Sequence, residues 1–86
     1  MTLGGIEYSA QFVDQQGDTC IYRIDEWSKG RMTRTFTGRI SATQRATARE
    51  GQNSDSRSIE HWCELHPQLL PEDGGTVDID LKSLML

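Results

Sequence analysis

The sequence predicts a small α+β domain: an antiparallel sheet of three to four strands, covered on one face by one or two short helices. Three observations indicate this class. Apolar and polar residues alternate through the first forty positions, which is the period of half-buried strands. A helical apolar period follows around Trp62, and alternation returns over residues 77–81. The length of 86 residues suits one domain, residues 1–86.

The first two predicted strands are separated by the turn DQQGD, residues 14–18, in which Gly17 can adopt a positive φ. The apolar faces of these strands comprise Ile6, Tyr8, Ala10 and Phe12 on the first and Cys20, Tyr22 and Ile24 on the second. If the turn is centred in this segment, Glu7 lies opposite Asp25. Two acids in that position would destabilise the pair of strands.

The segment SKG, residues 28–30, predicts a short hairpin loop with Gly30 in the left-handed conformation. On the third strand the pattern places Met32, Phe36 and Ile40 toward the core. It pairs Tyr22 with Phe36 and Trp27 with Arg31. The opposite face of this strand then carries Arg31, Thr33, Thr35, Thr37 and Arg39.

Two helices are expected after the third strand. Ser41 and Gln44 form a capping box, so a short alanine-rich helix is predicted over residues 42–50, with Gly51 as its end. GQNSDS, residues 51–56, is predicted to be a loop whose Ser54 or Asp55 caps the second helix. The face of that helix carries Ile59, Trp62, Cys63 and His66, and Pro67 ends it.

No motif in the sequence predicts catalysis, a metal site or a cofactor, so the chain is expected not to be an enzyme. The segment HWCELH, residues 61–66, has ligand-type side chains. However, His61 and His66 lie on different sides of a helix and Cys63 points with Trp62 toward the core. Cys20 and Cys63 are expected to be buried thiols in a reducing compartment, which with the absence of a signal peptide favours a cytoplasmic location.

Charge is segregated along a chain whose formal net charge is −4. Residues 29–57 hold seven basic and two acidic residues, whereas the flanking segments are both acidic. Arg34 falls on the inner face and needs a carboxylate, for which Glu26 is the nearest candidate. Arg45 and Arg49 are expected to face solvent on the short helix.

The outer face of the third strand is the predicted partner-binding surface. Tryptophan and arginine dominate protein interfaces, so the surface favours another protein as partner. An aromatic residue beside arginines also suits nucleic acid, which is the alternative. A third interpretation is that the acidic strands simply neutralise the arginines. The predicted contact residues are Trp27, Arg31, Thr33, Thr35, Thr37 and Arg39.

These observations predict a small binding module without chemistry of its own. Such modules serve as stand-alone regulators or inhibitors of larger assemblies, including inhibitors encoded by mobile elements or viruses. No apolar run is long enough to span a membrane. The apolar tail, residues 84–86, either folds onto the core or pairs with a second chain, so a homodimer through this tail or a sheet edge is one expectation.

Overall fold

The computed structural model describes residues 5–41 and 51–80, and it confirms the α+β class. Three long strands come first: β1 (Ile6–Gln16), β2 (Thr19–Ser28) and β3 (Arg31–Ser41). They are followed by the helix α1 (Gly51–Leu65), the 3₁₀ turn η2 (Pro67–Leu69) and the short strand β4 (Thr76–Asp78). Within the described residues, no helix is long and apolar enough to cross a bilayer.

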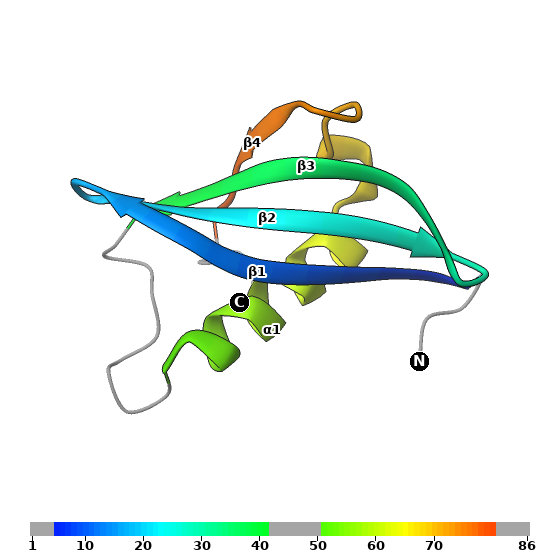
Figure 1. The fold of residues 1–86 in the computed structure, drawn as a ribbon, viewed down its shortest axis with the longest axis horizontal. Coiled ribbons are helices and arrows are strands. Elements are labelled where there is room, and N and C mark those ends of the chain that lie inside the picture. Colours follow the sequence, from blue (N-terminus) through cyan, green and yellow to red (C-terminus); the bar gives the residue numbers. More distant parts are fainter. Residues whose placement is uncertain (1–4, 42–50, 81–86) are drawn as a thin grey trace.

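The four strands form one sheet in the order β1-β2-β3-β4, and α1 lies across one of its faces (Figure 1). The first three strands are antiparallel, as predicted. The prediction of a wholly antiparallel sheet is wrong for β4, which runs parallel to β3. The segment that contains α1 brings the chain back toward the start of β3, so β4 can run in the same direction as β3.

Both hairpin turns are tighter than the sequence suggested, so the predicted registers are wrong. Lys29 (φ 53°) and Gly30 (φ 78°) alone connect β2 to β3, as in turns that require two positive φ values. β1 continues to Gln16, which leaves a turn of only Gly17 and Asp18.

The true partners of Tyr22 and Glu7 lie two residues from the predicted ones, and that of Trp27 on β3 lies one residue away. Tyr22 lies opposite Gly38, not Phe36, and Phe36 lies opposite Ile24. Trp27 lies opposite Met32 on β3 and opposite Glu7 on β1, and the predicted Glu7–Asp25 pair does not form. Shifts in register, which indicate bulges, occur between Phe12 and Asp14 and between Glu26 and Trp27.

The core lies between the sheet and α1. Packing is close at Gly38, because a Cβ there would stand 2.7 Å from Ile24 Cδ1 and 2.8 Å from Ile79 Cδ1. The ring of Phe12 meets that of Tyr22 edge-on, with centroids 5.6 Å apart. The buried apolar residues are Ala10, Cys20, Tyr22, Ile24, Phe36, Ile40, Ile59, Trp62, Cys63 and Ile79.

The helix confirms one part of its prediction and contradicts another. Ile59, Trp62 and Cys63 are buried on one face as expected, and the helix ends just before Pro67. The predicted loop over 51–56 is wrong, because α1 already begins at Gly51. Ser54 and Asp55 therefore lie within the helix, and Gly51 belongs to α1 and does not end a helix. The predicted helix at 42–50, with Arg45 and Arg49, lies outside the described residues, as does the tail at 84–86.

The turn before β4 forms hydrogen bonds with the outer edge of β3. Gly74 N–H donates to the Thr35 carbonyl (2.7 Å), and Thr37 N–H donates to the Gly75 carbonyl (2.9 Å). The Asp73 carboxylate accepts from Thr35 N–H (2.8 Å). The edge of β3 is thus engaged before the ladder with β4 begins.

Candidate functional site

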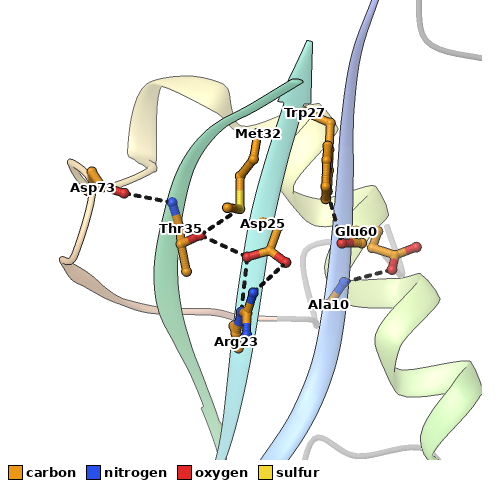
Figure 2. Close-up of polar contacts among 9 residues, drawn as sticks. Ala10, Arg23, Asp25, Trp27, Met32, Thr35, Glu60 and Asp73 are labelled. Atoms are coloured by element: carbon orange, nitrogen blue, oxygen red, sulfur yellow. Dashed lines mark hydrogen bonds and ion pairs between the residues drawn. The ribbon is translucent and has the colours of Figure 1, made fainter. Parts of the chain in front are cut away.

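Trp27 lies on the sheet face that α1 does not cover, near the tip of the β2–β3 hairpin. Its indole Nε1–H donates to Ser9 Oγ (3.3 Å), which fixes the ring against β1 (Figure 2). Met32, its neighbour on β3, is 50% exposed, and its sulfur lies 3.1 Å from Thr35 Oγ1. The prediction that Met32 faces the core is therefore wrong. The shift in register at Trp27 turns this side chain to the open face instead.

The same irregularity moves Thr33 away from the predicted surface. Its hydroxyl donates to the Glu26 carboxylate (2.8 Å), which also accepts from Tyr8 (3.0 Å) and Arg34 (2.7 Å). Tyr8 packs against the core beneath the sheet. Thr33 thus belongs to a cluster on the helix side and is not part of the open face.

Asp25 is the most unusual residue of the open face, because its carboxylate is buried there although no helix covers it. The residue is 6% exposed. The carboxylate accepts from Arg23 Nε (3.1 Å) and Nη2 (3.3 Å) and from Thr35 Oγ1 (2.9 Å), as Figure 2 shows. Sequence reasoning missed this network, although two opposite charges at i and i+2 on one strand were a usable signal.

The predicted surface is divided between two ends of the sheet. Arg39 pairs with Asp78 of β4 (2.6 Å), and both side chains are exposed. Arg39 lies opposite Ile21, six residues along β2 from Trp27, so the two are about 20 Å apart at ~3.3 Å per residue. Thr37 lies between them, opposite Arg23 and Thr76. One partner contact centred on Trp27 does not need Arg39.

Among the described basic residues of the three long strands and their turns, only those at the hairpin tip lack an ion pair. Lys29 and Arg31 are exposed and form no ion pair with any described carboxylate. The other three, Arg23, Arg34 and Arg39, each contact an acid at 2.6–3.1 Å. Arg31 lies opposite Ser28, next to Met32 on the same strand, so its side chain starts from the other face of the sheet. We call the group of Trp27, Lys29 and Met32 the hairpin-tip surface.

A cavity of about 310 Å³ adjoins the hairpin-tip surface. Its lining residues are Gly5, Glu7, Trp27, Lys29 and Gly30. Glu7 and Lys29 are both exposed and form no ion pair with each other. A second cavity of similar volume lies at the opposite end of the sheet, where Arg39 and Asp78 already neutralise each other.

Arg34 behaves as the sequence predicted and contacts Glu26 at 2.7 Å. It also donates to the Pro71 carbonyl (2.6 Å) and lies over the Phe36 ring, 5.6 Å from the centroid. The guanidinium lowers the pKa of Glu26 from its ordinary value, and the hydrogen bonds from Thr33 and Tyr8 act in the same direction. Burial, then the bond to Glu26, raises the pKa of Tyr8 to about 12.

The HWCELH segment forms no metal-binding cluster within residues 5–41 and 51–80. Cys63 is fully buried, and burial raises the pKa of its thiol to about 12. The His66 ring packs on Trp62, with centroids 5.2 Å apart, whereas His61 is exposed near Glu64. These side chains are separated as predicted, and the expected absence of bound metal stays a prediction.

Comparison with known proteins identifies no relative: no protein family, no curated protein and no solved structure matches the chain. A functional conclusion therefore depends on the geometry of the open face alone.

Proposed function

We propose that this chain is a small protein-binding module whose contact site is the hairpin-tip surface. One observation carries the proposal. Trp27 and Met32 lie on the face that α1 leaves uncovered, and Lys29, an exposed cation with no described counter-charge, lines the cavity beside Trp27. An aromatic anchor surrounded by polar and charged groups is typical of the centre of a protein interface.

The rest of the open face supports this anchor by holding it rigid. The ring of Trp27 is fixed through Ser9, and the side chain of Thr35 joins Met32 to the buried Asp25. A surface that is ordered before binding loses less conformational entropy when the partner docks. Of the residues predicted from the sequence, Trp27 is the proposed contact and Thr35 supports it, whereas Arg31, Thr33, Thr37 and Arg39 lie outside it.

The proposed role is that of a cytoplasmic regulator or inhibitor, which acts by occupying a surface of a larger assembly and not by chemistry. Nucleic acid is the competing ligand, because bases stack on tryptophan and a phosphate can pair with Lys29. Glu7 lines the cavity beside Trp27 and would repel a phosphate backbone. Nucleic acid is therefore the less favoured ligand.

The test is affinity capture from an extract of the source cells with four immobilised proteins: the wild type, Trp27→Ala, Lys29→Ala and Arg57→Ala. Arg57 is the matched control, since it is an exposed arginine on α1. The captured protein is identified by mass spectrometry and its affinity for each purified variant measured by calorimetry. We expect Trp27→Ala to weaken binding at least tenfold, about 1.4 kcal/mol, and Arg57→Ala to leave it unchanged.

Each contrary result has a definite meaning. Equal binding by all four folded proteins would place the contact elsewhere and refute the proposed site. If capture disappears after nuclease treatment, the ligand is nucleic acid and not a protein. Melting curves of each variant separate loss of the contact from loss of the fold.

A further inference from the structure

We propose that Met32 is a redox-sensitive site, at which oxidation of the thioether to the sulfoxide weakens the Thr35–Asp25 hydrogen bond of the open face and the binding of a partner. The oxidant is a peroxide, and hydrogen peroxide is the one used below. The part that concerns the partner rests on the proposed function. The part that concerns Thr35 and Asp25 rests on the geometry of the open face alone.

Met32 is the one exposed sulfur-containing residue within residues 5–41 and 51–80. It is 50% exposed, whereas Cys20 and Cys63 are fully buried. Burial also raises the pKa of the Cys63 thiol to about 12, so this thiol stays protonated and unreactive near neutral pH. A peroxide that meets the folded protein should therefore react at Met32 before it reaches either cysteine.

The reaction transfers one oxygen atom to the sulfur. A lone pair of Met32 Sδ attacks one oxygen of hydrogen peroxide, and the O–O bond breaks. The hydroxide that leaves takes the proton of the transferred oxygen and becomes water. The sulfur is oxidised by two electrons and the peroxide is reduced, so no group of the protein has to supply an electron. The product is a polar sulfoxide in place of an apolar thioether.

The position of the sulfur connects this reaction to Asp25. Met32 Sδ lies 3.1 Å from Thr35 Oγ1, and the same hydroxyl donates to Asp25 Oδ1 at 2.9 Å (Figure 2). A hydroxyl has one proton and a thioether is a weak acceptor, so in the reduced protein the carboxylate receives the proton. The oxygen of a sulfoxide is a stronger acceptor than the thioether and competes with Asp25 for this proton.

The burial of Asp25 makes this competition costly. The residue is 6% exposed, and the other hydrogen bonds that the structure describes for its carboxylate come from Arg23. A buried acceptor that loses a donor is not compensated by water, so the folded state loses stability. Met32 also lies opposite Trp27, so oxidation places a polar oxygen in the apolar part of the hairpin-tip surface.

The site of oxidation is tested by treating the folded protein with dilute hydrogen peroxide. Cleavage by trypsin places the three methionines on separate peptides, residues 1–23, 32–34 and 83–86, so mass spectrometry reports each one. We expect an added oxygen on Met32 while both cysteines remain thiols. Oxidation of either cysteine as fast as Met32 would overturn the proposal.

The link to Asp25 is tested by thermal unfolding of the wild type, Thr35→Ser and Thr35→Val, each before and after oxidation. Loss of one hydrogen bond should lower the melting temperature of the wild type by about 5 °C. Thr35→Ser keeps the hydroxyl and should show the same decrease. Thr35→Val has no hydroxyl to lose, so oxidation should lower its melting temperature far less. Equal decreases in Thr35→Ser and Thr35→Val would overturn the link.

A second measurement does not depend on the stability of the Thr35 variants. In NMR spectra of the wild type, the indole N–H signal of Trp27 should shift after oxidation and that of Trp62, which is 3% exposed, should not. Treatment with methionine sulfoxide reductases, one for each epimer of the sulfoxide, should restore the signal. Met32→Leu treated with peroxide is the control for the other two methionines and should show no shift. A shift of the same size in Met32→Leu would overturn the proposal.

The partner part uses the affinity capture described above, with reduced, oxidised and reductase-treated wild type immobilised in parallel. Retention of the protein that depends on Trp27 should fall about fivefold on oxidised wild type, about 1 kcal/mol, and recover after reduction. Peroxide-treated Met32→Leu should retain as much as untreated Met32→Leu. Unchanged retention on oxidised wild type would overturn the effect on the partner, while capture that depends on Trp27 would still support the proposed function.

Discussion

The middle of β3 and its end at the hairpin tip use arginine in opposite ways. On the covered face, Arg34 contacts Glu26, the Pro71 carbonyl and the Phe36 ring, and so connects β2, β3 and the turn before β4. At the hairpin tip, beyond the core, Arg31 is exposed and has no described counter-charge. Position relative to the core, not residue type, decides whether an arginine stabilises the fold or is available for a partner.

The largest effect is expected at Arg34. Arg34→Ala leaves the Glu26 carboxylate and the Pro71 carbonyl without their charged donor, and breaking such a largely buried pair costs about 3 kcal/mol. In a domain of this size the melting temperature should fall by more than ~10 °C. Arg31→Ala is the control and should change stability by less than ~0.5 kcal/mol. Equal destabilisation by both variants in urea titrations would contradict the contrast between the middle of β3 and its end at the tip.

A smaller but clear effect is expected from a side chain added to the covered face. Gly38→Val would place its Cβ within 2.8 Å of Ile24 and Ile79, and overpacking a closed core costs about 2 kcal/mol. Thr37→Val is the matched change one residue earlier and should be nearly neutral. Thermal melts of the two variants test this, and a stable Gly38→Val protein would show that the core beneath β3 has spare room.

The covered face should also make stability depend on pH at both extremes. The lowered pKa of Glu26 means that its contribution is complete above its ordinary value and is lost as pH falls. The pKa values of Tyr8 and Cys63, both about 12, mean that their contributions are complete below their ordinary values and decline as pH rises toward 12. Urea titrations across pH should show decreases at both ends, and Tyr8→Phe should reduce the alkaline one.

The smallest effect is expected at Arg39, which forms an exposed ion pair on the open face. Its partner Asp78 is 75% exposed, and such surface pairs contribute little to stability. Arg39→Ala should change the free energy of unfolding by less than ~0.5 kcal/mol and should not weaken partner binding. Loss of binding in this variant, with the fold intact, would show that the contact reaches the β4 end of the sheet.

Alternation and helical period were enough to predict the three long strands, the inner face with Tyr22 and Ile24, and the helix face with Trp62. The Arg34–Glu26 pair was also predictable, because an inward arginine requires an acid. The register of the strands could not be predicted, since it depends on the length of the turns. The segment SKG fits several loops, and only the structure shows that Lys29 adopts a positive φ beside Gly30.

The site could be predicted only in part for the same reason. A single register irregularity near Trp27 brings Met32 to the open face and moves Thr33 to the helix side. Alternation assigns both residues to the opposite faces, because it assumes an unbroken ladder. The parallel pairing of β4 with β3 also could not be predicted, since a three-residue strand has no pattern that indicates its direction.

The hydrogen bond between α1 and β1 has a consequence for self-assembly. The Glu60 carboxylate accepts the Ala10 N–H (2.8 Å), a main-chain donor in the outermost long strand of the sheet (Figure 2). An incoming strand would need that donor to extend the sheet, and would also have to displace a charged side chain. Glu60 therefore opposes the addition of further strands at this edge, as in fibril growth. A homodimer built by adding strands to β1 would first have to break this bond.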